Sequence, residues 1–180
     1  MTRVRTTPGR LRALWGAALL ALLAACATVP PPAAPPSSAS ASPFNATDSA
    51  WIQLMIPMNE QLLPALALAP PPLAAFAAEL DASHRAELGR LKRLRERAGL
   101  PEDNVHAGHQ MPGLVSEADL AGLRMDPSGL PAKLREHLDQ SASLARGEQE
   151  SGADPETREL AASIAAARAG QLARLEEVSP

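Results

Sequence analysis

The same helical pattern occurs twice in this chain, in residues 52–95 and again in residues 132–175. Each copy reads as a helix, a short break and a longer helix, with apolar residues recurring every three or four positions. The two copies are aligned with each other by two similar stretches, Glu87–Leu91 (Glu-Leu-Gly-Arg-Leu) and Gln171–Leu175 (Gln-Leu-Ala-Arg-Leu). A helical hairpin with one apolar face buries that face economically against a second hairpin. The repeat therefore predicts an all-α fold, an antiparallel four-helix bundle.

The first hairpin is expected over residues 48–99. Its first helix begins at Thr47 or Asp48. It contains Pro57 and Pro64, which predict either a kink or a break because proline removes a backbone donor. Its second helix begins near Pro72 and ends at Gly99, which are residues typical of a helix start and a helix end.

The second hairpin is expected over residues 131–178, after a polar connector of residues 100–130. Within the connector, Ser116 and Asp119 resemble a capping box and predict one short helix. After the hairpin's first helix, Asp154 and Pro155 provide a helix-capping side chain and a proline suited to the first turn. The bundle therefore occupies residues 48–180, with one additional short helix.

Composition supports a helical fold. Only 2% of the 180 residues are aromatic and tyrosine is absent, whereas β-sandwiches and barrels usually build their cores from aromatic and β-branched residues. The net charge is −3 and arginines are spread along the helices. A nucleic-acid-binding protein concentrates positive charge on one face, so we expect no nucleic-acid partner.

Residues 1–25 have the features of a secretory signal peptide. A basic head is followed by an apolar run, Ala13–Ala25, that is too short to span a bilayer permanently. The run ends in Leu23-Ala24-Ala25-Cys26, which looks like the lipobox of a bacterial lipoprotein, and Cys26 is the sole cysteine. This likeness implies cleavage before Cys26 and attachment of lipid to its thiol. The alternative is an ordinary signal with a coincidental cysteine.

Residues 26–47 would then be the lipidated cysteine and a tether. The segment 27–47 contains six prolines, many alanines and serines, and no charged residue, so it cannot bury a core. Cleavage leaves 13 basic and 20 acidic residues, a net charge of −7. Acyl chains rather than a basic patch must therefore hold the protein at a membrane, on the extracytoplasmic face.

The order of these features resembles the bacterial DUF305 family over about Asp48–Val178. The matching stretches are Leu54–Pro57, Met111–Ser116 and Asp154–Ala161. The resemblance implies a ferritin-like four-helix bundle, and several family members are associated with copper. Copper is thus the cofactor that the resemblance implies.

The resemblance also implies a His-His pair at the same place in each repeat. Here the first pair is replaced by Met58 and Asn59, and the second by His137 and Leu138. One imidazole in place of four suggests a weak or lost metal site, because a single imidazole does not chelate a metal ion.

A mixed pocket could replace the lost imidazoles. His84 and Glu87 lie one turn apart on the inward side of their helix, and thioether and imidazole groups would face them from the partner helices. The set that this pocket would use is Met55, Met58, His84, Glu87 and His137. The alternative is that the methionines fill the core and the histidines form hydrogen bonds at its edge.

The connector offers another donor set, His106, His109 and Met111, in a loop that could wrap a copper ion. A solvated polar loop is the alternative.

The residues contain no enzyme signature. The di-iron bundle proteins need Glu-x-x-His on paired helices, whereas His84-Arg85-Ala86-Glu87 has the reverse order and occurs once. Two functions remain: a non-catalytic, lipid-anchored bundle with a weak or lost metal site, and a copper-binding lipoprotein. The partner that the sequence predicts is membrane lipid, through the acylated Cys26. The sequence assigns no protein partner and leaves open whether two copies of the chain form a homodimer.

Overall fold

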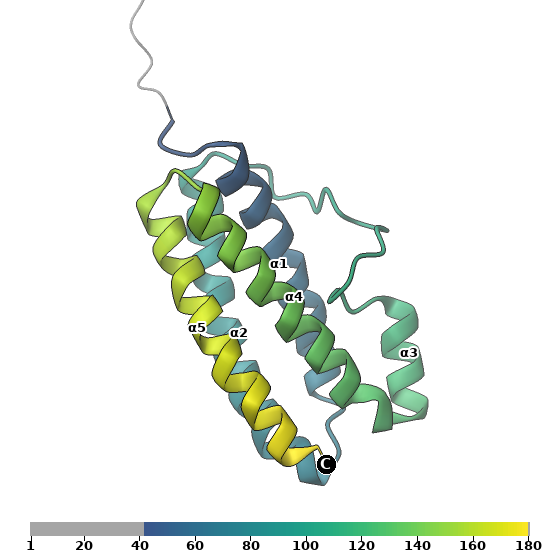
Figure 1. The fold of residues 1–180 in the computed structure, drawn as a ribbon. Helices are drawn as coiled ribbons and strands as arrows, with labels where there is room; N and C mark the ends of the chain where they lie inside the picture. Colours follow the sequence, from purple (N-terminus) through teal and green to yellow (C-terminus); the bar gives the residue numbers. More distant parts are fainter. Residues whose placement is uncertain (1–41, 180) are drawn as a thin grey trace, which may run out of the picture. The chain divides into compact units, whose positions relative to one another are not determined.

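The computed structural model describes residues 42–179, which form five α-helices and one short 3₁₀ helix (Figure 1). In chain order these are α1 (Ala46–Leu66), α2 (Pro71–Arg97), α3 (Glu117–Met125), η1 (Pro127–Gly129), α4 (Leu130–Ser151) and α5 (Pro155–Val178). None of the described helices is long and apolar enough to cross a membrane.

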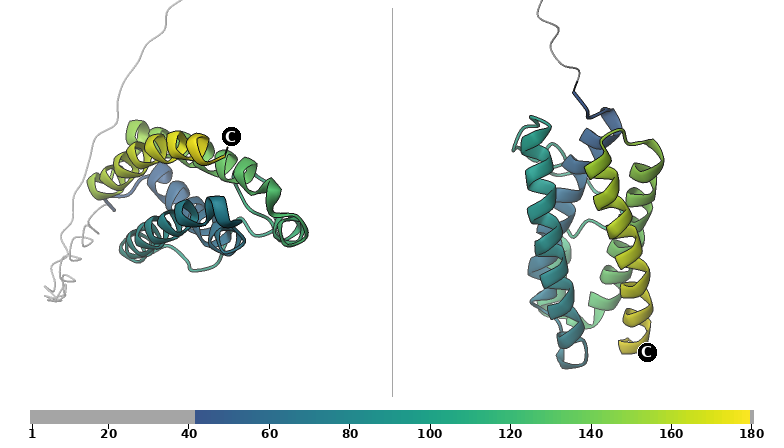
Figure 2. Two further views of the ribbon diagram at one scale, coloured as in Figure 1. Left: turned by 90° about the horizontal axis from the view of Figure 1, so that it is seen from below. Right: turned by 90° about the vertical axis from the view of Figure 1, so that its left-hand side faces the viewer.

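The long helices form an antiparallel four-helix bundle of two hairpins. α1 packs on α2, α4 packs on α5, and the hairpins meet through α1 against α4 and α2 against α5. The end-on view in Figure 2 shows the hairpins as two facing layers, with α3 to one side. The predicted fold class is therefore confirmed, including the short helix in the connector.

Capping side chains determine where three of the helices begin. Asn45 accepts a hydrogen bond from the Asp48 backbone, and the Asp48 carboxylate accepts one from the Asn45 backbone at 2.6 Å. This capping box starts α1 at Ala46, one or two residues before the predicted start, because Asn45 rather than a later residue is the cap. Ser116 with Asp119 caps α3, and Asp154 caps α5, as the sequence predicts.

α1 runs as one helix through both Pro57 and Pro64, so the predicted alternative of a break is not what the chain adopts. Pro57 is buried in the bundle, whereas Pro64 is exposed near the C-terminal end of the helix. Burial of most of the helix offsets the loss of two intrahelical hydrogen bonds.

The core consists of two apolar clusters. The lower cluster lies around the α1–α2 turn, α3 and the start of α4, and it includes Leu62, Leu80 and Leu134. The upper cluster lies towards the other end of the bundle and includes Met58, Leu91 and Ile164.

Polar residues occupy the level between these clusters. Each long helix places one or two buried polar residues at or near the boundary between residues of the upper and the lower cluster. We call this set the polar layer: Asn59, His84, Glu87, His137, Ser141 and Arg168.

A carboxylate joins the two hairpins at the end where α1 begins. Asp48 is fully buried and accepts hydrogen bonds from the backbone N–H groups of Ala153 and Asp154 in the α4–α5 turn, at 3.0–3.1 Å. Burial alone would raise the pKa of Asp48, but the backbone donors, Asn45 among them, hold the pKa below its usual value. Asp48 is thus an ionised link between α1 and the second hairpin.

Glu148 lies beside this link, buried, and neither of its carboxyl oxygens has a hydrogen-bond partner among the described residues. Burial first, and then the neighbouring Asp48, raise the pKa of Glu148 to about 8. Glu148 is therefore mainly protonated at neutral pH in the folded protein.

We predict that Glu148→Gln stabilises the protein at pH 7. In the unfolded chain the carboxyl ionises near its ordinary pKa of 4.5, so the folded state holds one more proton between that value and about 8. Stability contributed by this group is present at low pH and is lost as the pH rises through this window. The neutral variant removes this loss, a gain of up to about 3 kcal/mol at pH 7.

Urea unfolding across this pH window measures the effect, with Glu150→Gln on the exposed face of α4 as the control. A Glu148→Gln variant whose stability depends on pH as steeply as that of the parent would contradict the prediction.

Candidate functional site

Two histidines from different hairpins meet in the polar layer. His84 on α2 and His137 on α4 are both fully buried, and their Nε2 atoms are 3.2 Å apart. The ring planes are tilted by 49°, with centroids 5.2 Å apart. The structure therefore brings together two of the five residues predicted for the mixed pocket.

The other nitrogen of each ring faces a backbone carbonyl. His84 Nδ1 lies 2.8 Å from the Leu80 carbonyl oxygen, and His137 Nδ1 lies 2.9 Å from that of Gly113. A carbonyl oxygen only accepts hydrogen bonds, so these contacts assign the proton to Nδ1 in both rings.

A glycine makes the contact to His137 possible. Gly113 has a φ of 77°, and a Cβ at this position would lie 2.7 Å from the Gln140 Cβ and 3.1 Å from the Glu136 carbonyl oxygen. A residue with a side chain would push the connector away from α4. The glycine in the stretch Met111–Ser116 thus brings the connector's carbonyl within reach of a core imidazole.

Burial keeps both rings neutral. Burial is the largest cause, the neighbouring His84 contributes for His137, and the positive charge of Arg168 contributes for both; together these lower the pKa of each ring to about 3. Since each neutral ring carries its proton on Nδ1, the two Nε2 atoms face one another with their lone pairs.

The centre of the polar layer also contains an internal ion pair. Arg168 on α5 is fully buried, and its guanidinium donates to both carboxylate oxygens of Glu87, at 2.9 and 2.5 Å. It also donates to Ser141 Oγ at 2.8 Å and to Gln171 Oε1 at 2.9 Å. Both oxygens of Glu87 are therefore engaged by an arginine rather than free for a metal ion.

Arg168 is not among the residues predicted from the sequence to form the pocket. The signal lay in the repeat register, because the alignment of Glu87 with Gln171 also aligns His84 with Arg168. The two hairpins therefore contribute their inward polar side chains from equivalent positions on their second helices.

The remaining residues of the predicted pocket lie next to this layer. Met55 and Met58 are packed in the upper apolar cluster. Asn59, which follows Met58, is fully buried, and neither atom of its amide group has a hydrogen-bond partner among residues 42–179.

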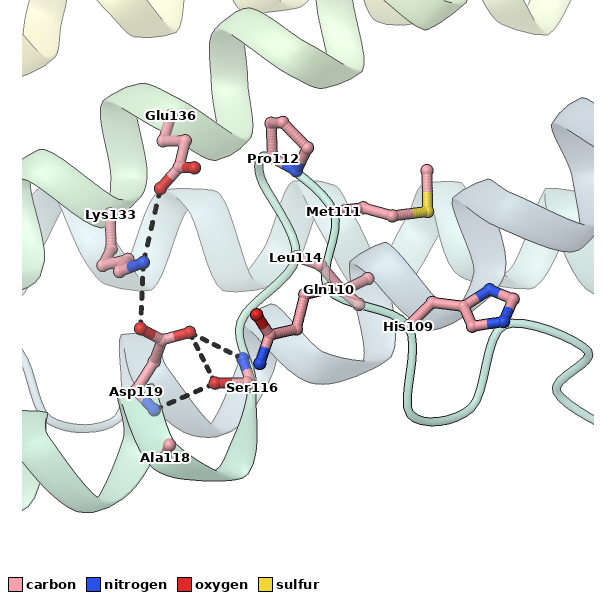
Figure 3. Close-up of a pocket in the computed structure, with 10 residues that line it drawn as sticks. All are labelled: His109, Gln110, Met111, Pro112, Leu114, Ser116, Ala118, Asp119, Lys133 and Glu136. Atoms are coloured by element: carbon pink, nitrogen blue, oxygen red, sulfur yellow. Dashed lines mark hydrogen bonds and ion pairs between the residues drawn. The ribbon is translucent and has the colours of Figure 1, made fainter.

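The predicted connector residues lie around two surface hollows. His109 and Met111 line a cavity of about 440 Å³, on whose opposite side Lys133 pairs with Asp119 at 2.9 Å and with Glu136 at 3.4 Å (Figure 3). His106 lines a separate groove beside Trp51, although the rings of His106 and His109 have centroids only 5.9 Å apart.

No three His, Cys, Asp or Glu side chains within residues 42–179 are grouped so that they could hold a metal ion. For the copper implied by the sequence resemblance, Glu87 does not fit as a ligand because Arg168 occupies it, whereas the two facing imidazoles do fit. Cys26 lies outside the described residues.

Comparisons with known proteins agree with this fold. No family model and no curated protein matches the chain. A solved crystal structure of a DUF305 fragment from Deinococcus radiodurans is similar, with a TM-score of 0.65 over 76% of this chain and 97% of that fragment. The similarity in structure establishes a DUF305-type fold. Because the sequences are only 20% identical, it establishes the fold alone. The resemblance predicted from the sequence is confirmed at this level.

We predict that Arg168→Met is strongly destabilising, by about 3–5 kcal/mol, because it leaves the Glu87 carboxylate buried without its partner. The double variant Arg168→Met/Glu87→Leu should recover most of this loss, since replacing both charges by apolar groups is often close to neutral. Chemical denaturation of both variants measures the difference.

Glu79→Gln, which removes an exposed ion pair with Arg174, is the control and should cost less than about 1 kcal/mol. Equal destabilisation by Arg168→Met and by this control would show that the buried pair is not a stabilising contact.

Proposed function

We propose that this protein is a non-catalytic, lipid-anchored bundle on the extracytoplasmic face of the membrane, with a role in binding or interaction there. The observation that carries the proposal is the Arg168–Glu87 pair. It places an internal cation in the predicted metal pocket and binds the one carboxylate that the pocket would have used.

Four of the buried charged side chains support a structural rather than catalytic use. Glu87 and Arg168 neutralise one another, and Asp48 and Asp154 accept backbone hydrogen bonds at helix starts. A general acid or base needs a proton-transfer path to a substrate, whereas these side chains are committed to partners within the fold.

The lipid anchor is supported by the position of the sole cysteine. Cys26 directly follows the apolar run of the signal-like segment, and an uncharged, proline-rich tether separates it from the bundle. Stable attachment requires two acyl chains or one chain with a second signal, and modification of an N-terminal cysteine after cleavage would supply several chains.

A second function, copper binding through Met and His ligands, is favoured by one observation. His84 and His137 come from different hairpins and nevertheless meet at their Nε2 atoms. Thioether and imidazole groups are suitable copper ligands, and Met58 lies in the cluster directly above the polar layer.

Copper titration of the purified chain separates the two functions. The proposed function predicts no tight site that depends on Met58, so Met58→Ala and the parent should bind copper equally. A single tight site lost in both Met58→Ala and His137→Ala would favour the copper-binding function. A weaker site lost only on deletion of residues 105–111 would place the binding in the connector.

We predict that Cys26→Ser abolishes membrane attachment. The variant has no thiol to acylate, so it should leave the membrane fraction and lack the mass of the lipid. Cell fractionation and intact-mass measurement test this prediction, with a serine substitution at Ala27 as the matched control. A parent protein found in the medium with an unmodified thiol would refute the proposed anchor.

A further inference from the structure

We propose that His84 and His137 form a binding site for one divalent transition-metal ion, held through their two Nε2 atoms. The inference goes beyond the proposed function, because an anchored bundle can serve as a binding surface with or without this ion. It also differs from the copper pocket considered above, since its protein ligands include neither a thioether nor a carboxylate.

The hydrogen bonds of the two rings prepare them as metal ligands. Each Nδ1 donates to a backbone carbonyl, Leu80 for His84 and Gly113 for His137. This is the arrangement that usually supports metal-bound histidine, because it fixes the ring orientation and leaves Nε2 as the donor atom.

The separation of the donor atoms fits one ion. Two nitrogens bound to a tetrahedral zinc ion at about 2.0–2.1 Å lie about 3.3 Å from each other. The two Nε2 atoms lie 3.2 Å apart. Linear two-coordinate binding would need them farther apart, so the spacing favours an ion with tetrahedral geometry.

Without an ion or a shared proton, this contact is unfavourable. Two lone pairs face one another in a part of the core that water does not reach, because both histidines are fully buried. A cation between them, or to one side of the line that joins them, turns this repulsion into two bonds.

A second observation in the same layer also indicates a missing partner. Asn59 is fully buried with an unpartnered amide oxygen and an unpartnered amide nitrogen, and buried polar groups are rarely left in that state. Its position between the two apolar clusters places it at the level of the histidines. The layer therefore contains a second buried polar group whose hydrogen-bonding capacity is unmet.

The charge of the layer sets the strength of the site. The positive charge of Arg168 disfavours a cation, but the bidentate bond to Glu87 balances that charge. With two protein nitrogens and no anionic ligand, the site should be weaker than a structural zinc site, which has four protein ligands.

The test uses the purified full chain with cobalt(II) as a spectroscopic probe and zinc(II) as competitor. We expect one equivalent of cobalt with the visible absorption of tetrahedral coordination, displaced by one equivalent of zinc. His84→Gln and His137→Gln should each weaken binding by more than about tenfold. Met58→Leu, and His106→Gln with His109→Gln in the connector, are the controls and should leave binding unchanged.

A second measurement keeps the test decisive if the core variants do not fold. Nitrogen NMR of the imidazoles in the metal-free parent should show both rings protonated at Nδ1, and zinc should shift both Nε2 signals. A proton shared between the two Nε2 atoms that zinc does not displace would overturn the inference. So would cobalt binding that is lost in the connector variants and retained in the core variants. None of these readouts depends on membrane attachment, so failure here is distinct from failure of the proposed function.

Discussion

The ion pair between Arg168 and Glu87 constrains the interior of the bundle more than any apolar contact does. A buried guanidinium requires a partner at a fixed distance, whereas leucines and alanines can be exchanged or shifted at moderate cost. Arg168 finds its partners on α2, α4 and its own helix, through Glu87, Ser141 and Gln171. These bonds fix the vertical register of three helices, a role for which buried polar groups are well attested in helical assemblies.

The polar layer also explains why the apolar core is divided. Above and below it, aliphatic side chains form separate clusters, so the bundle has two small cores in place of one continuous core. Small residues, such as Ala145 and Ala161, let the helices approach closely but contribute little buried area each. Hydrogen bonds in the layer therefore carry much of the specificity of the packing.

The sequence predicted the fold well because the relevant signals are local and repeated. The apolar period, the duplicated hairpin and the caps at Ser116 and Asp154 each depend on residues close together in the chain. The start of α1 lies one or two residues before the predicted start because its cap, Asn45, stands at the end of the proline-rich segment, where composition predicts a tether. The continuity of α1 through Pro57 could not be predicted, since it depends on packing against helices distant in sequence.

The site was less predictable because it depends on contacts between hairpins. The inward placement of His84 followed from helical periodicity and the interest of His137 from the family resemblance, and the structure shows that the two rings meet. Arg168 was missed because it stands in an alanine-rich stretch, where an isolated arginine is usually a solvated residue. The role of Gly113 could not be predicted for a different reason. The connector backbone at Gly113 lies close to α4, and this contact depends on residues that are distant in the sequence.

The link made by Asp48 has a mechanical consequence. Its carboxylate joins the first turn of α1 to the α4–α5 turn, and the Asn45 side chain adds a bond to the Ser151 carbonyl at 2.8 Å. Tension applied through residue 42 is therefore shared between both hairpins instead of peeling α1 away from its neighbours. A chain pulled from its amino-terminal side would have to break this cluster of bonds before any long helix could separate.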